Sequence, residues 1–227
     1  MDGIGPLTHS MNFAPPFART GCDGQPAFMK LIVYNDCTMK EIIELVKADS
    51  RYRKNIEYGE PRPGHPEGKV KFHIADLEEN LEALRIKGIS QENYWKLMFL
   101  IHTHDSFKAE AKKDAPAQDP QSHATLAREF ARQFTNDGDL LNMIQFHDEN
   151  YKLWQEYLQN GSFSSERFQK LLNIIENWDL FLMFIIIDGC VKGKDYSKLA
   201  WFINEVRWHK NTMVDSSWVL PSPNQAG

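Results

Sequence analysis

The stretch DLFLMFIIID, residues 179–188, decides the fold of this chain, because eight consecutive apolar residues lie in it between two aspartates. A helix that is apolar on every side is normally buried among other helices. The run is also far shorter than the roughly 20 apolar residues that are needed to span a bilayer. The sequence therefore predicts a central helix in a helical domain, and no membrane partner.

On both sides of this run, apolar residues recur with the period of an α-helix. Glycine and proline separate the periodic segments, most clearly in the loop YGEPRPGHPEGK at residues 58–69. The predicted helical segments are 38–53, 70–86, 92–113, 122–135, 138–159, 164–190 and 195–208. We therefore predict an all-α bundle of six or seven helices.

Three regions differ in composition. Residues 1–28 are rich in glycine, proline and small polar residues and show no sustained period, which predicts an irregular N-terminal arm. Residues 29–212 form the predicted helical domain, in which 29–36 (MKLIVYND) is either a strand or an ordered lead-in. Residues 213–227 contain two prolines and are predicted to form a flexible C-terminal tail.

Composition excludes several classes of protein. With 42% hydrophobic residues among 227, the chain is neither disordered nor collagen-like. A formal charge of −5 gives no basis for binding extended nucleic acid. The three cysteines have no CxxC spacing, which argues against a disulfide framework, and no secretory signal is visible at the start. These features predict a cytoplasmic protein.

Ionisable residues fall on the apolar faces of several predicted helices. They are His73, His104, Asp105, His123, His147, Asp148 and Asp188. One histidine on such a face is most simply a hydrogen-bonded core residue. A whole set is different, because each buried ionisable group costs several kcal/mol unless it is paired or ligated. A shared metal centre would satisfy them together, and imidazole with carboxylate suits Mn, Fe, Co, Ni or Zn.

The order of these residues resembles the HD-domain superfamily of metal-dependent phosphohydrolases. The segment from His104 to Lys108 reads HDSFK and matches the HD-x-x-K form of that family. His73 precedes it on one helix and Asp188 follows it on another, while His123 and His147 fall where dinuclear members place two further histidines. The resemblance covers about residues 60–210, and it implies an HD-domain-like helical bundle.

Some branches of the family fit this chain less well. His147-Asp148 replaces the adjacent histidines of the branch that cleaves cyclic dinucleotides, and the GYP tripeptide of that branch is missing. Lys69 stands where trinuclear members have a glutamate. Lys108 stands where the short nucleotidases have a catalytic glutamate. The resemblance therefore implies a dinuclear enzyme outside these branches.

The resemblance also implies roles for single residues. One divalent transition-metal ion would take His73, His104, Asp105 and Asp188, and a second would take Asp105 as a bridge with His123 and His147. Lys108 would hold a phosphate oxygen as a point charge. Asp148 would orient a ligand histidine, protonate a leaving group, or lie in solvent. The expected substrate is a small phosphorylated compound such as a nucleotide, and a homodimer is left open.

Two other functions stay open at this point. Some HD proteins with the same six ligands hold two irons and act as oxygenases on small polar substrates. Alternatively, the chain is a helical binding module that keeps a metal for stability. Structural metal sites are normally closed and tetrahedral rather than open and paired, which favours an enzyme.

Overall fold

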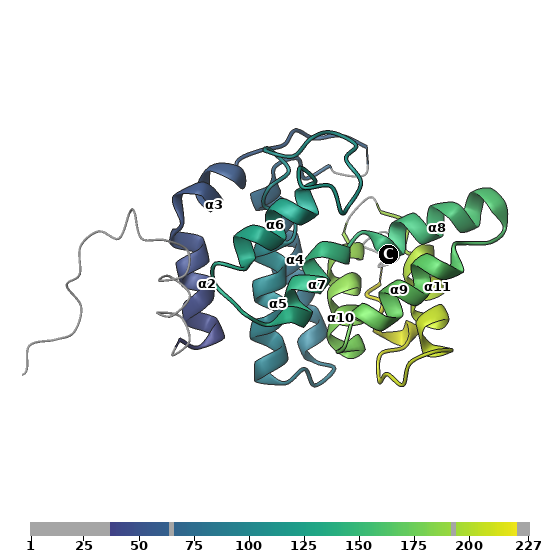
Figure 1. The fold of residues 1–227 in the computed structure, drawn as a ribbon. Coiled ribbons are helices and arrows are strands. Elements are labelled where there is room, and N and C mark those ends of the chain that lie inside the picture. The colour runs from purple at the N-terminus through teal and green to yellow at the C-terminus, as the bar shows by residue number, and fades with distance from the viewer. Residues whose placement is uncertain (1–36, 64–65, 192–193, 222–227) are drawn as a thin grey trace, which may run out of the picture.

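The computed structural model describes residues 37–63, 66–191 and 194–221 (Figure 1). Within these ranges the chain is helical and has no β-strand, which confirms the predicted all-α class. The helices are α2 (Met39–Ala48), α3 (Ser50–Asn55), α4 (Val70–Arg85), α5 (Gln91–Thr103), α6 (His123–Ala131), α7 (Gly138–Phe146), α8 (Glu149–Asn160), α9 (Ser165–Ile174), α10 (Trp178–Gly189), α11 (Ser197–Arg207) and the 3₁₀ helix η1 (Ser216–Trp218). The predicted arm, 1–28, and the segment 29–36 lie outside the described residues.

Helix α10 is the central element, as its composition predicts. Every residue from Leu180 to Ile187 is buried, and the helix packs against α4, α5 and α11. Burying a side chain of this size stabilises the fold by about 1.5–3 kcal/mol. In Figure 1, α2 and α3 lie at one end of the molecule, and α8, α9 and α11 lie at the other. In the described ranges no helix is both long and apolar enough to cross a membrane.

Three of the predicted segments are each divided into two helices. The segment 38–53 breaks at Asp49, whose backbone is extended and whose carboxylate accepts hydrogen bonds from the first turn of α3. The segment 164–190 breaks before Asn177, which caps α10 in the same way. Short polar side chains compete with the helical hydrogen-bond pattern, and they therefore end one helix and begin the next. The third break, between α7 and α8, falls at His147 and Asp148.

The described part of the predicted tail, 213–221, is packed against the bundle rather than free. Val214 is fully buried, and Trp218 in η1 packs against the core. The carboxylate of Asp179 at the start of α10 accepts a hydrogen bond from Met213 N at 2.8 Å. These contacts join the end of the chain to the central helix.

Candidate metal centre

The loop before α4 sets the position of His73. Lys69, the residue before the helix, gives no side-chain cap. Backbone carbonyl groups before the helix cap it instead: Val70 N donates to Tyr58 O at 2.9 Å, and Lys71 N donates to Ile56 O at 2.9 Å. Since the first backbone N–H groups of a helix have no partner inside it, these bonds fix the helix start. His73 follows on the first turn and is buried.

The same loop brings a carboxylate to His73. Gly59 has a φ of +116°, and a Cβ atom there would lie 2.4 Å from Gly68 O, so only glycine lets the loop close. The loop then places Glu67 Oε1 3.6 Å from His73 Nδ1, with only 8% of the Glu67 side chain exposed. A carboxylate on the outer nitrogen of a histidine orients the ring, and is common behind metal ligands.

His104 and His147 lie at the C-terminal ends of α5 and α7, where backbone carbonyl groups orient both rings. His104 Nδ1 lies 3.0 Å from Leu100 O, and His147 Nδ1 lies 2.8 Å from Ile144 O. A carbonyl oxygen can only accept, so Nδ1 donates in each ring, and in the neutral ring Nε2 carries the lone pair. Both Nε2 atoms face the same buried space, where they can bind a metal.

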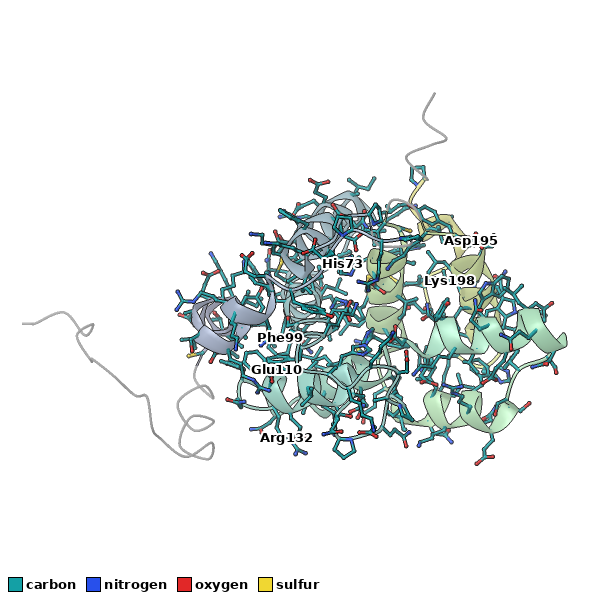
Figure 2. All side chains as sticks on the ribbon, turned by 90° about the horizontal axis from the view of Figure 1, so that it is seen from above. His73, Phe99, Glu110, Arg132, Asp195 and Lys198 are labelled. Atoms are coloured by element: carbon teal, nitrogen blue, oxygen red, sulfur yellow. The ribbon has the colours of Figure 1, made fainter. Side chains whose placement is uncertain are left out.

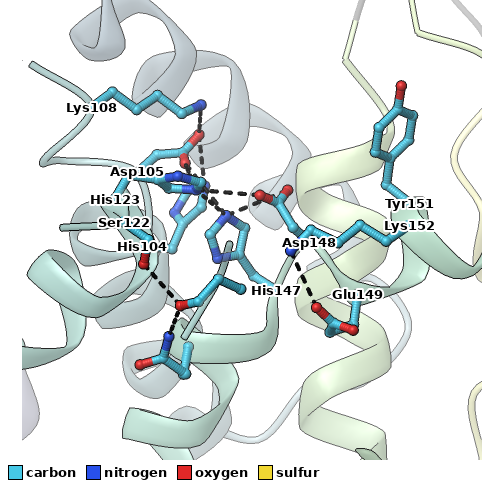
Figure 3. A network of polar contacts seen from close by, with 12 residues as sticks. His104, Asp105, Lys108, Ser122, His123, His147, Asp148, Glu149, Tyr151 and Lys152 are labelled. Carbon is cyan, nitrogen blue, oxygen red and sulfur yellow. Dashed lines mark hydrogen bonds and ion pairs between the residues drawn. The ribbon is translucent and has the colours of Figure 1, made fainter. Parts of the chain in front are cut away.

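The predicted ligands gather in two groups of three. The first holds His73 from α4, His104 from the end of α5 and Asp188 from α10. The second holds Asp105, His123 from the start of α6 and His147. Within each group the candidate ligand atoms all lie within 4.8 Å of one another. Figure 3 shows His104, His123 and His147 converging on the carboxylate of Asp105.

Asp105 lies between the two groups, and each of its oxygens faces one of them. Oδ2 is 3.7 Å from His73 Nε2 and 3.5 Å from His104 Nε2. Oδ1 is 3.7 Å from His123 Nε2 and 3.4 Å from His147 Nε2. Asp105 therefore has the position of a carboxylate that can bridge two ions.

Asp105 and Lys108 are not on a helix, although the sequence predicts one to residue 113. Helix α5 ends at Thr103, and residues 104–110 form tight turns. The hydroxyl groups of Thr103 and Ser106 donate to backbone carbonyl groups one turn earlier, those of Phe99 and His102. Such bonds from serine and threonine weaken a helix. The turn directs Asp105 into the interior instead.

Two buried atoms of the site have no hydrogen-bond partner among the described residues: His104 Nε2 and Asp105 Oδ1. An unsatisfied polar atom of this kind costs about 1–3 kcal/mol. A divalent ion in each group would satisfy one of them, because imidazole nitrogen and carboxylate oxygen are ligands of first-row transition metals. The residues present therefore fit a metal centre of mixed nitrogen and oxygen ligands.

Lysines neutralise two carboxylates of the site. Lys108 Nζ forms an ion pair with Asp105 Oδ2, and Lys194 Nζ lies 3.4 Å from Asp188 Oδ1. Burial alone would raise the pKa of Asp105. Lys108 and His104 lower it by more than that, so the pKa lies well below its ordinary value. For Asp188, burial is likewise outweighed, mainly by Lys194, and its pKa is also well below the ordinary value. Both groups are therefore carboxylates at neutral pH.

Asp148 contacts the second group. Its Oδ2 lies 3.2 Å from His123 Nε2 and its Oδ1 lies 3.6 Å from His147 Nε2, while 41% of its side chain is exposed. Burial raises the pKa of Asp148, but His147 and His123 outweigh this and lower it below its ordinary value. A general acid needs a raised pKa. Of the three roles that the sequence leaves open, contact with the ligand histidines agrees best with this position.

A cleft of about 540 Å³ leads from the two groups to the surface. At its inner end lie Asp105, His147 and Asp188. Its walls carry side chains from α8 and from the chain around the start of α11. They include Tyr151, Trp154, Lys194, Asp195 and Lys198. Tyr151 and Trp154 follow His147 at the helical spacings of four and seven residues. No period connects Lys194, Asp195 and Lys198 with the histidines, and only the fold brings these three to the cleft.

Comparison with protein families, with curated proteins and with solved structures found no match to this chain.

Proposed function

We propose that this chain is an HD-type metal-dependent phosphohydrolase that cleaves a phosphoester of a small phosphorylated compound, such as a nucleotide. The position of Asp105 carries the proposal. A single carboxylate whose two oxygens face two separate groups of histidines is suited to bridge a pair of metal ions. Such ions, when bound, would supply an activated water and neutralise charge on the phosphoryl oxygens.

Different residues would hold each of the two ions. His73, His104 and Asp188 would hold the first ion with Asp105 Oδ2. His123 and His147 would hold the second with Asp105 Oδ1, and Asp148 lies close enough to both histidines to complete that side. Carbonyl groups at the ends of α5 and α7 keep the rings of His104 and His147 in place, so that their orientation does not depend on the ligand.

The charge in the cleft favours an anionic substrate. Its lining includes four carboxylates, those of Asp105, Asp148, Asp188 and Asp195, and three ammonium groups, those of Lys108, Lys194 and Lys198. The net charge of this set is −1, and two divalent ions would change it to +3. A cleft of that charge attracts an anion such as a phosphate ester.

The openness of the site favours turnover over a structural metal. Metals that only stabilise a fold are normally enclosed by four protein ligands. Here Asp148 is partly exposed, and the ligand residues Asp105, His147 and Asp188 line a cleft that has room for a small molecule. A compound in the cleft would therefore reach the metal ligands directly.

The decisive experiment combines metal analysis with a substrate screen. Protein purified without chelators is analysed for bound elements, then assayed against nucleotides and other phosphoesters with Mn, Fe, Co, Ni or Zn. Asp188→Asn tests the first group. Asp49→Asn is the matched control, because Asp49 caps α3 and asparagine caps a helix equally well.

We expect phosphate release by the wild type and by Asp49→Asn, and a loss of about a hundredfold or more in Asp188→Asn, since removing even an outer partner of a metal ligand costs 10–100-fold. Bound metal without phosphate release from any ester would contradict the proposal and indicate a binding module. Oxygen consumption with an EPR signal of mixed-valent iron, again without phosphate release, would indicate an oxygenase.

A further inference from the structure

Lys198 differs from the other two lysines of the cleft. Lys108 and Lys194 each pair with a carboxylate of the proposed centre. Lys198, on the first turn of α11, is half-buried, and among the described residues neither a hydrogen bond nor an ion pair holds its ammonium group. Its Nζ lies over the ring of Tyr151, 5.2 Å from the centroid. A partly buried ammonium group in a cleft, with no described carboxylate within ion-pair distance, is suited to an anion of a ligand.

The surroundings of Lys198 support this reading. Figure 2 shows Lys198 and Asp195 close together. Burial lowers the pKa of Lys198 and Lys194 lowers it further, and together they outweigh the opposing carboxylates of Asp188, Asp148 and Asp195. The ammonium group is therefore only partly compensated. An anion between Lys194 and Lys198 would complete the compensation.

Metal binding would increase the need for an anion at this place. Asp188 is the counter-ion of Lys194, with 3.4 Å between Oδ1 and Nζ. Once Asp188 also binds a divalent ion, less of its negative charge remains for Lys194. Lys194 and Lys198 would then be two adjacent cations on one wall of the cleft, separate from Lys108 beside Asp105.

The size of the cleft provides the room. A volume of about 540 Å³ lies within the roughly 300–1,000 Å³ of pockets that hold whole small molecules, and is more than a single phosphate group needs. Tyr151 and Trp154 on α8 supply an apolar wall, and Asn150 and Gln155 supply hydrogen-bonding groups. A ligand that fills this space extends from the metal groups to α11.

We propose that the cleft binds a compound with two phosphate groups, one at the metal ligands and the second between Lys194 and Lys198 beside Tyr151. The identity of the first phosphate as the reacting group rests on the proposed function. Binding of the second phosphate does not depend on turnover, so the two proposals can fail separately.

The test compares ligands that differ by one phosphate. Manganese-loaded wild type, Lys198→Met and Lys170→Met are titrated calorimetrically with fructose 1,6-bisphosphate and fructose 6-phosphate, and with adenosine 3′,5′-bisphosphate and adenosine 5′-monophosphate. Methionine keeps the apolar length of lysine and removes its charge. Lys170 is the matched control, because it lines a different pocket of about 540 Å³ that contains none of the predicted metal ligands. Phosphorus NMR after each titration checks that the probe is intact, and KM from initial rates replaces Kd where it is not.

In the wild type we expect the bisphosphate of at least one pair to bind about tenfold more tightly than its monophosphate, which is about 1.4 kcal/mol. In Lys198→Met this preference should fall to within about twofold, and Lys170→Met should behave as the wild type. Equal binding of both members of both pairs, or an equal effect of the two variants, would overturn the inference. A preference that depends on Lys198 without hydrolysis of any ester would sustain it and refute the proposed reaction.

Discussion

His102 and His104 lie two residues apart at the end of α5, and both are almost fully buried, yet their surroundings differ. Both ring nitrogens of His102 have partners: Nδ1 lies 2.6 Å from Tyr52 Oη, and Nε2 lies 2.9 Å from Glu78 Oε1. Within the described part of the chain, His104 has a hydrogen-bond partner only at Nδ1, and its Nε2 faces the carboxylates of Asp105 and Asp188. Burial therefore does not distinguish a ligand from a core histidine. An unpartnered ring nitrogen facing carboxylates does.

The difference follows from the helix itself. Residues two positions apart are about 200° apart around a helix and therefore face opposite sides. His102 faces α3 and α4, which supply Tyr52 and Glu78. His104 faces α10, where Phe184 packs edge-on against its ring with 5.1 Å between the centroids. One side of α5 thus carries a closed hydrogen-bond network, and the other carries the candidate metal centre.

The strongest test of this difference removes one carboxylate from each side of α5. Asp105→Ala should abolish metal binding in both groups and lower any activity by at least about a hundredfold, because Asp105 is the residue between them. Glu78→Ala removes the carboxylate beside His102 and should leave metal content unchanged. Elemental analysis and metal titration measure both.

If Asp105→Ala does not fold, His123→Ala provides the same information, since 26% of the His123 side chain is exposed. It should lose the ion of the second group first and keep the other. Two ions per chain in Asp105→Ala, or a loss of metal in Glu78→Ala, would show that the two sides of α5 are not divided in this way.

Protonation also distinguishes the candidate metal centre from the hydrogen-bond network around His102. The expected effect on metal affinity is similar in size to that of the substitutions. Burial lowers the pKa of His147, but Asp148 and Asp105 outweigh it and raise the pKa to about 9. A metal ion must displace this proton, so apparent metal affinity should rise by up to about tenfold per pH unit between pH 7 and 9. Burial lowers the pKa of His102, which should therefore release no proton. Proton release during metal titration, followed with a pH indicator, measures this.

The metal-free protein should show the matching change in stability. Since the folded-state pKa of His147 is raised, its charge stabilises the fold fully below the ordinary pKa of about 6.5, and this contribution is lost as pH rises through 9. The free energy of unfolding of the metal-free protein in urea should fall over that range. A flat profile together with metal uptake that is independent of pH would mean that His147 is neutral without metal.

The smallest expected effect comes from Tyr52→Phe. It removes the hydroxyl group that contacts His102 Nδ1 and leaves that buried atom without its partner, at a cost of about 1–3 kcal/mol. Metal content and affinity should not change. Urea unfolding and elemental analysis measure the two quantities together. A change in metal affinity without a change in stability would show that the hydrogen-bond network acts on the metal centre.

Much of this arrangement can be predicted from the sequence. The apolar run in α10 indicates its central position, and the period of the leucines places His73 on the buried face of α4. Six of the seven histidines and aspartates that the sequence singles out meet in two groups, and Asp148 lies beside the second. These predictions succeed because burial of ionisable groups on apolar helix faces is a local property of the sequence.

The parts that could not be predicted depend on helix ends and loops. His104 and His147 lie at C-terminal ends, where free carbonyl groups orient them, and a periodic pattern does not locate an end to one residue. Glu67 lies just before α4, but only the closure of that loop turns it towards His73, and no spacing rule predicts this. Lys198 comes from a segment far from the histidines in sequence, and only the packing of α10 and α11 brings it to the site.

Helices α10 and α11 approach each other closely at Gly189. A Cβ atom at Gly189 would lie 2.5 Å from Leu199 Cδ2, so α10 and α11 come together where a side chain is missing. Asp188 and Lys198 are the chain neighbours of these two residues. The absent methyl group thus allows the close approach of the two helices that carry Asp188 and Lys198. A larger residue at 189 would have to displace the Leu199 side chain or move α11, and with it Lys198, away from Asp188.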